Sequence, residues 1–222
     1  MRPLNSAGAN GLPFDKTYWD DMYVEDEESV IDGIYNAENH ARYVYELLQL
    51  FEISVKSLGD FGFGLGILLR EFVSILKPKK IIAIDPSEEA VMRLIQQNWV
   101  SSLHIAVRKT TLEAFESKHL ETDPLDLIIC NSVLQYIPEK DISFCFEKLS
   151  RICKYLYITI PTKKDYIFMK NELNFTDPYA YSRNKSFYTR SYKKYFTCVS
   201  HNLLESKITV KDSPILFDLF KF

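Results

Sequence analysis

The chain has 222 residues, of which 46% are hydrophobic and 26% charged, and its formal net charge is −3. This length suits one domain with a full apolar core and makes a second catalytic domain unexpected. No apolar run approaches the roughly 18 residues that would span a bilayer, and residues 1–13 lack the apolar core of a signal peptide. We therefore expect a cytoplasmic protein with no membrane partner.

Residues 1–33 are expected to form an N-terminal extension that is partly disordered and can cap a site. Its second part, from residue 14 onward, is acidic and holds the aromatic residues Tyr18, Trp19 and Tyr23. Aromatic side chains of this kind can cover a ligand and exclude water from it. The main domain is then expected at residues 34–222.

A helix is expected from Asn36, because apolar residues recur there with the period of one helix face. His40 lies on the same stripe. At such a position a histidine is more often a packed core residue than a functional one, and both interpretations stay open. The stripe is formed by Val44, Leu47, Leu48 and Phe51.

Beyond residue 54, apolar runs of strand length alternate with helical patterns, which predicts a parallel sheet with crossover helices. The strands are continuous apolar runs, as expected where both faces of a sheet are covered. Ser87 is expected to cap one of the helices. The strands are expected at 55–58, 81–84, 103–107, 125–130 and 155–160, and the helices at 66–76, at 87–98, from 111, and at 140–153.

The C-terminal part has a different pattern. Residues 203–210 and 215–222 lie too close together for a crossover helix, so we expect them to pair as an antiparallel hairpin. Before them, residues 162–190 form an insertion rich in aromatic and basic residues. It is either a lid over a site or a helix with aromatic packing on the sheet edge. Its basic residues form either a solvated face or a cover for an acidic substrate or nucleic acid.

A glycine-rich turn joins the first expected strand to the following helix. It contains Asp60, Gly62, Gly64 and Gly66 in the pattern Asp-x-Gly-x-Gly-x-Gly, and Asp85 ends the next strand. Glycine permits both the sharp turn and the approach of a ligand to bare backbone. A carboxylate about twenty residues further on can accept hydrogen bonds from a ribose. The pair therefore indicates a nucleoside cofactor.

The turn resembles motif I of the class I S-adenosylmethionine-dependent methyltransferases. The dinucleotide fingerprint needs a third small residue, where this chain has Ile67 or Leu69. Residues 124–138 and 149–161 resemble the fourth and fifth strands of the same family. The resemblance implies an α/β fold, a Rossmann-like three-layer sandwich whose seven-stranded sheet is mostly parallel and has an antiparallel C-terminal strand. It also implies the cofactor S-adenosylmethionine.

The same resemblance implies a set of cofactor-binding residues. The glycine turn would hold the aminocarboxypropyl part, Asp85 the ribose, and Asn131 the ammonium group. Relatives often have an acidic residue after the third strand, whereas this chain has Arg108, Lys109, Thr110 and Thr111. The expected cofactor residues are Asp60, Gly62, Gly64, Gly66, Asp85, Pro86, Thr111, Leu112 and Asn131.

No catalytic residue is named, because methyl transfer from a sulfonium depends mainly on positioning and desolvation of the acceptor. Tyr136 stands where relatives often have histidine, and packing at the start of the next helix is an equally good interpretation. No structural metal is expected, and Cys130, Cys145, Cys153 and Cys198 are expected to be free thiols, most of them buried. The expected substrate residues are Tyr18, Trp19, His40, Tyr136 and Tyr188.

The acceptor is expected to be a small molecule, possibly anionic, that is methylated on oxygen or nitrogen. The loop after the fourth strand lacks the Asn/Asp-Pro-Pro-Tyr/Phe pattern with which some enzymes grip a flipped base. Nucleic acid is therefore a less favoured partner. The alternatives are an RNA or protein methyltransferase, and a methyltransferase-like binding subunit without turnover. The oligomeric state is left open.

Overall fold

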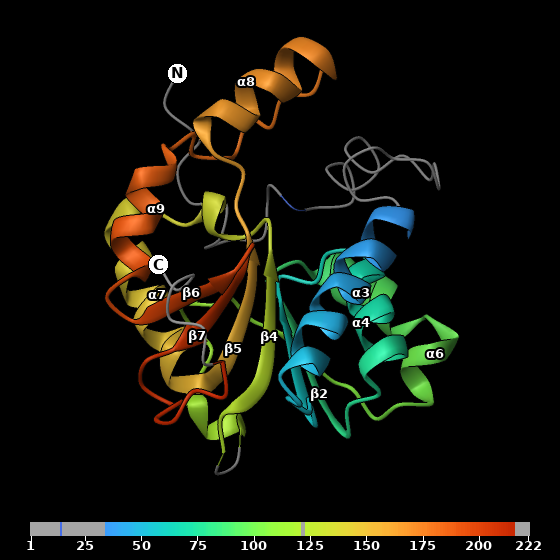
Figure 1. Ribbon diagram of the computed structural model, residues 1–222. Helices are drawn as coiled ribbons and strands as arrows, with labels where there is room; N and C mark the ends of the chain where they lie inside the picture. Colours follow the sequence, from blue (N-terminus) through green and yellow to red (C-terminus); the bar gives the residue numbers. More distant parts are fainter. Residues whose placement is uncertain (1–13, 15–33, 121–122, 216–222) are drawn as a thin grey trace.

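The structure is a computed structural model that describes residue 14, residues 34–120 and residues 123–215 (Figure 1). Its centre is a seven-stranded sheet with the strand order β3-β2-β1-β4-β5-β7-β6. β1 to β5 pair in parallel, and β7 runs antiparallel to both of its neighbours. The strands are β1 (Ser57–Phe61), β2 (Lys80–Asp85), β3 (Ala106–Lys109), β4 (Leu125–Asn131), β5 (Cys153–Thr159), β6 (Phe196–Ser200) and β7 (Leu203–Ser206).

Helices cover both faces of the sheet, as Figure 1 shows for α3, α4 and α6 on one side and α7 and α9 on the other. The three-layer, mostly parallel architecture predicted from the sequence is confirmed. The helices are α3 (Ile34–Leu50), α4 (Ile67–Leu76), α5 (Glu88–Ile95), α6 (Asn98–Ser101), α7 (Glu139–Ile152), α8 (Lys163–Glu172) and α9 (Lys185–Tyr192), with short 3-10 turns at Ser117–Leu120 and Leu134–Tyr136.

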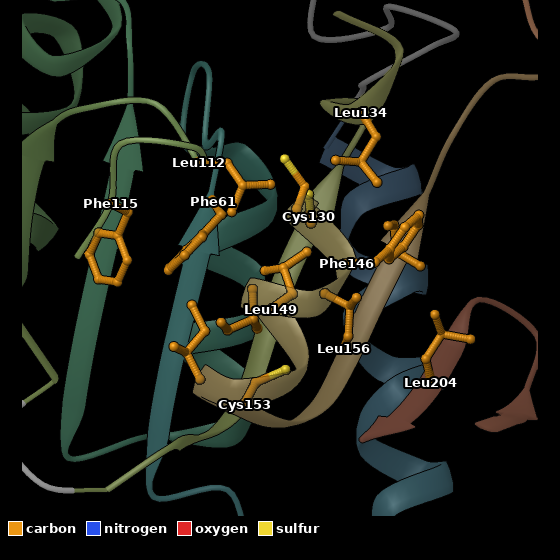
Figure 2. Close-up of a cluster of buried hydrophobic side chains, with 14 of the residues drawn as sticks. Phe61, Leu112, Phe115, Cys130, Leu134, Phe146, Leu149, Cys153, Leu156 and Leu204 are labelled. Carbon is orange, nitrogen blue, oxygen red and sulfur yellow. The ribbon is translucent and has the colours of Figure 1, made fainter. Parts of the chain in front are cut away.

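The core has one part on each side of the sheet, because successive strand residues point to opposite faces. In β4, Leu127 and Ile129 belong to the cluster under α3 and α4, and Ile128 and Cys130 belong to the cluster under α7. Figure 2 shows part of the second cluster. All these strand residues are buried, so β4 is apolar on both faces and sits at the centre of the sheet.

α3 buries one stripe of side chains against the core, and the predicted stripe is confirmed in part. Val44 and Leu48 are buried, Leu47 and Phe51 are half-buried, and Ala37 and Ala41 extend the buried stripe toward the start of the helix. The predicted cap is also confirmed, since the hydroxyl of Ser87 accepts a hydrogen bond from the backbone N–H of Ala90. The single helix expected at 87–98 is instead divided into α5 and α6, because Gln97 adopts an extended conformation between them.

The predicted C-terminal hairpin is corrected by the structure. Residues 203–206 do form an antiparallel strand, β7, but it pairs with β5 and with β6, a strand that the sequence analysis did not expect. The β6–β7 turn at His201 and Asn202 has no glycine or proline to mark it, and Asn202 takes the left-handed conformation with φ 58°. Residues 216–222 lie outside the described part of the chain.

The insertion contains α8, α9 and the segment between them. α8 has no buried residue, whereas α9 packs through the buried Tyr188. None of the helices in the described ranges combines the length and apolarity that crossing a membrane requires. The basic side chains of the insertion and of residues 191–194 that are exposed to solvent are Lys163, Lys164, Lys170, Lys185, Arg190, Lys193 and Lys194.

Arg183 is the exception among these basic residues, with only 9% of its surface exposed. Its guanidinium donates hydrogen bonds to the carbonyl oxygens of Leu134 (3.3 Å) and Ile137 (2.6 Å). It also lies over the ring of Tyr181, 4.5 Å from the ring centre. Arg183 therefore ties the insertion to the loop that follows β4.

We expect Arg183→Met to destabilise the fold, because the substitution removes the guanidinium that donates to the carbonyl of Ile137, to the carbonyl of Leu134 and to the hydroxyl of Tyr188. The loss should be roughly 2 kcal/mol or more. Urea unfolding followed by circular dichroism measures it. The matched control is Arg190→Met on the exposed face of α9, which should change stability by less than about 0.5 kcal/mol. Equal stability of the two variants would contradict this role of Arg183.

Candidate functional site

A cavity of about 340 Å³ lies at the carboxyl ends of the central strands. This is the edge at which open parallel sheets bind ligands, since the strand order reverses between β1 and β4. Its walls come from the start of α3 (Asn36, Ala37, His40), the glycine turn with the start of α4 (Phe61 to Leu65, Ile67, Leu68), the ends of β2 and β3 (Ile84, Asp85, Pro86, Thr110 to Glu113), the ends of β4 and β5 (Asn131 to Val133, Tyr136, Ile137, Thr159) and Phe14.

The glycine turn fits closely against its neighbours. Gly62 has φ 91°, and a Cβ atom placed on it would lie 2.2 Å from Cγ2 of Val133. Gly66 has φ 75°, and a Cβ atom there would lie 2.5 Å from Cδ1 of Leu94. Both positions therefore need glycine for the backbone conformation and for space. The turn packs against the loop after β4 through Gly62 and against α5 through Gly66.

Asp85 connects this turn to the start of α5. Its Oδ2 accepts a hydrogen bond from the backbone N–H of Gly64 (3.0 Å), and its Oδ1 accepts one from Ser87 (2.8 Å). Burial raises the pKa of Asp85 to about 6, although the two backbone hydrogen bonds act in the opposite direction. The carboxylate therefore fixes both segments at the mouth of the cavity.

Asp60 lies behind the glycine turn and is only 2% exposed. Within the described residues it makes no hydrogen bond and no ion pair. Burial, and to a smaller extent the nearby Asp85, holds the pKa of Asp60 well above its ordinary value of 3.8. A buried carboxyl group without a partner is unusual, because its ionised form is costly in such surroundings. A bound cation would lower that cost.

An aromatic wall lies at one side of the cavity, where Phe14 and Tyr136 line it and Tyr179 packs against Phe14. The rings of Phe14 and Tyr136 meet edge to face with their centres 5.1 Å apart, and the centres of Phe14 and Tyr179 are 6.3 Å apart. The backbone carbonyl of Phe14 accepts a hydrogen bond from the hydroxyl of Ser87 (2.6 Å). The hydroxyl of Tyr136 donates to Oδ2 of Asp177 (2.6 Å). The wall thus joins α5, the loop after β4 and the insertion.

His40 lines the cavity from α3, and its Nδ1 is hydrogen-bonded to the hydroxyl of Tyr157. Burial, with a smaller contribution from His201, lowers the pKa of His40 below its ordinary value of 6.5. The ring is therefore largely neutral at neutral pH. Because Nδ1 is occupied by Tyr157, Nε2 is the nitrogen left for a ligand.

The structure places most of the predicted site residues around one cavity. Asp60 and Gly66 stand directly beside it without lining it, and Tyr18 and Trp19 lie outside the described residues. The predicted cofactor and substrate residues that line the cavity are Gly62, Gly64, Asp85, Pro86, Thr111, Leu112, Asn131, His40 and Tyr136.

Tyr188 requires a correction. It does not line the cavity, is only 4% exposed and belongs to the core cluster under α7. Its hydroxyl accepts a hydrogen bond from Arg183 (3.2 Å). The helical spacing of α9 points this residue toward the sheet, so it packs the insertion onto the domain.

Sequence reasoning missed several residues of the site. Asn36 and Ala37 lie one helical turn before His40, so their spacing carried a usable signal. Val133 lies just after β4 and Thr159 is the last residue of β5, and ligand contacts are expected at such positions. Phe14 belongs to the extension that was expected to cap a site but was not singled out, and Asp177 had no sequence signal, because only the tertiary fold brings it to the aromatic wall. Across the described residues there is no group of His, Cys, Asp and Glu side chains arranged to hold a metal.

Comparisons with known proteins agree with this geometry. Residues 59–155 match a family model described as a methyltransferase domain. No curated protein matches the chain. The matched range contains the glycine turn, Asp85, and all of β2, β3 and β4, so it covers the cofactor end of the cavity.

Solved structures share the fold at low sequence identity. A magnesium protoporphyrin IX methyltransferase from Synechocystis PCC 6803 with bound S-adenosylhomocysteine is 16% identical, with 83% of this chain and 86% of that chain covered and a TM-score of 0.60. A S-adenosylmethionine-dependent methyltransferase from Clostridium acetobutylicum is 16% identical, with 73% and 63% covered and a TM-score of 0.56. A plantazolicin methyltransferase is 16% identical, with 80% and 63% covered and a TM-score of 0.57.

The chain spans 63% of the length of the Clostridium protein and of the plantazolicin enzyme, and 86% of the Synechocystis enzyme. At these identities the structural likeness shows a common fold, and the family model ties its central part to methyltransferases. Residues 59–155 are thus similar to a methyltransferase domain, and the chain shares the fold of S-adenosylmethionine-dependent methyltransferases.

Proposed function

We propose that the protein transfers a methyl group from S-adenosylmethionine to nitrogen or oxygen of a small-molecule acceptor, with both ligands in the cavity at the carboxyl ends of the strands. The observation that carries this proposal is the combination of the glycine turn with Asp60 and Asp85 at one end of that cavity. The aromatic wall lies at another side. One end suits the cofactor and the remaining space suits an acceptor of limited size.

The charge of the cofactor fits the residues at the turn. S-adenosylmethionine carries an ammonium group and a sulfonium, and Asp60 is a buried carboxyl group without a protein partner. Each oxygen of Asp85 accepts one backbone hydrogen bond and has a second lone pair for a ribose hydroxyl. Asn131 accepts a hydrogen bond from the hydroxyl of Thr159 through Oδ1 and can also accept from an ammonium group.

The adenine end is formed by Pro86, Thr111 and Leu112. Leu112 is buried and Thr111 half-buried, so this end is largely apolar. The hydroxyl of Thr111 accepts a hydrogen bond from the backbone N–H of Ala114 (3.2 Å), which fixes the turn after β3. This arrangement supports the placement of the adenine ring despite the lack of an acidic residue directly after β3.

The bound cofactor supplies an electrophilic methyl group, and the chain contributes position and a dry environment. Val133, Phe14 and Tyr136 exclude water from the side at which an acceptor enters. An acceptor held there loses its own hydration shell and reacts more readily. His40, whose pKa is lowered by burial, also lines the cavity and is neutral there.

An RNA or protein acceptor is the second candidate, and the exposed basic side chains of α8 and α9 are the observation that favours it. None of them lines the cavity. A small RNA methyltransferase shares the fold at 19% identity with a TM-score of 0.57, but only 20% of that chain is covered. RNA binding that weakens steeply as salt rises would favour this candidate.

Titration of the full chain with S-adenosylmethionine in a calorimeter tests the cofactor site. We expect Asp85→Ala to weaken binding by about tenfold or more, because it removes the ribose acceptor and releases the glycine turn. Asp126→Ala, at the opposite end of β4, is the control and should leave the affinity nearly unchanged. If the wild-type chain fails to bind the cofactor, or if Asp85→Ala binds as well as wild type, the proposed site is wrong.

Asp60→Asn should have opposite effects on stability and on cofactor binding. Because the folded protein holds the proton of Asp60 more tightly than the unfolded chain, ionisation costs stability as the pH rises above about 4. Asparagine has no such cost. The ligand-free variant should therefore melt at a higher temperature than wild type at pH 7, with the difference shrinking toward pH 4, and it should bind S-adenosylmethionine more weakly.

Asp126→Asn provides a control of opposite sign. Burial alone would raise the pKa of Asp126, but hydrogen bonds from Lys154 (2.7 Å) and from the backbone of Lys56 (2.8 Å) lower it overall. Its stabilising effect is present above its ordinary pKa and is lost as the pH falls. Asp126→Asn should melt earlier than wild type at pH 7. A lower melting temperature for Asp60→Asn at pH 7 would argue against an unpaired buried carboxylate.

A further inference from the structure

We infer that the acceptor carries an amine and that the protein methylates it on nitrogen. This inference rests on the proposed function and narrows it to one class of substrate. Three observations carry it: the sign of the charges around the cavity, the position of the basic side chains, and the chemistry of the aromatic wall.

The charged side chains at the cavity are acidic. Asp85 and Glu113 line it, Asp60 lies behind the glycine turn, and Asp177 lies behind Tyr136. Among the described residues that line the cavity there is no lysine and no arginine. The high pKa values of Asp60 and Asp85 agree with this picture, because a nearby basic group would have lowered them.

The basic residues of the insertion do not offset the negative charge of the side chains at the cavity. Lys163, Lys164 and Lys170 are exposed on α8 and do not line the cavity. The guanidinium of Arg183 is used by the carbonyl groups of Leu134 and Ile137 and by the hydroxyl of Tyr188. A carboxylate or phosphate of the acceptor would therefore find no lysine or arginine to pair with among the described residues that line the cavity. The expectation of a basic cover for an anionic acceptor is not supported.

The aromatic wall suits a cation. A positive charge over the face of an aromatic ring is attracted by the electrons of that ring, by about 0.5–2 kcal/mol according to exposure. Tyr136 donates its hydroxyl hydrogen to Asp177, which increases the electron density of the ring. Phe14 meets the same ring from the side. An ammonium group is thus recognised by the wall, while a carboxylate is repelled by it.

The chemistry of the transfer is consistent with an amine. The ammonium form is recognised first and loses one proton, which Nε2 of neutral His40 accepts in the tautomer whose Nδ1–H donates to the hydroxyl of Tyr157. The lone pair of the amine nitrogen then forms the new N–C bond. The S–C bond of the cofactor breaks, and its electron pair remains on sulfur. The products are a methylated amine, S-adenosylhomocysteine and one proton.

Three phenols whose side chains end in an ammonium group, a methyl group or a carboxylate test this inference. They are tyramine, 4-ethylphenol and 3-(4-hydroxyphenyl)propanoate, titrated into the full chain with and without saturating S-adenosylhomocysteine. We expect tyramine to bind at least about tenfold more tightly than the propanoate and more tightly than 4-ethylphenol. Tightest binding of the propanoate, affinities within about twofold of one another, or no binding of any probe at ~10 mM would overturn the inference.

A matched pair of variants locates the effect. Tyr136→Leu removes the ring and should reduce the preference for tyramine to less than about threefold, while S-adenosylhomocysteine affinity stays close to that of wild type. Phe168→Leu changes an aromatic residue on α8 that is 58% exposed and should keep the full preference. If Tyr136→Leu keeps the full preference for tyramine, the aromatic wall does not recognise the amine and the inference is wrong.

The same titrations separate this inference from the proposed function. If S-adenosylhomocysteine does not bind, the cofactor assignment fails, whatever the probes do. If it binds but the chain prefers the propanoate, the cofactor assignment stands and the amine inference fails.

Discussion

The hydrogen bonds that Asp85 accepts from Gly64 and Ser87 are the constraint on which the site depends. One carboxylate at the end of β2 fixes the turn after β1 and the first turn of α5. Both segments would otherwise present unpaired backbone N–H groups at the edge of the sheet. The same turn lies close to the loop after β4, since a Cβ atom on Gly62 would lie 2.2 Å from Cγ2 of Val133. Burial raises the pKa of the Asp85 carboxyl group to about 6, so it gives the cavity negative charge above that pH.

Much of the fold and of the cofactor end follows from local sequence patterns. The continuous apolar runs of β2, β4 and β5 predict buried parallel strands, and the stripe of α3 predicts the face that packs on them. The spacing from Asp60 to Gly66, with Asp85 after the next strand, predicts where a nucleoside can bind. Each of these patterns involves residues close together in the chain, so the strands, the helix face and the nucleoside site can be predicted without knowledge of tertiary contacts.

The acceptor end was less accessible to sequence reasoning. Phe14, Tyr136, Asp177 and Tyr179 come from three separate parts of the chain, and none belongs to a periodic pattern. Tyr188 was misassigned because an aromatic residue in a long insertion has no intrinsic direction, and packing of α9 turns it inward. β6 was missed because Asn202 forms the β6–β7 turn without glycine or proline. In each case a long-range contact decided the outcome.

α8 has no side chain in the core, and Ile167 and Phe168 are 53% and 58% exposed on it. Figure 1 shows it standing apart from the layers of the domain. Its residues can change with little effect on the folding of the rest, because the insertion is anchored separately by Arg183. Sequence changes in such a helix can therefore alter which partners the protein recognises while the residues around the cavity stay the same.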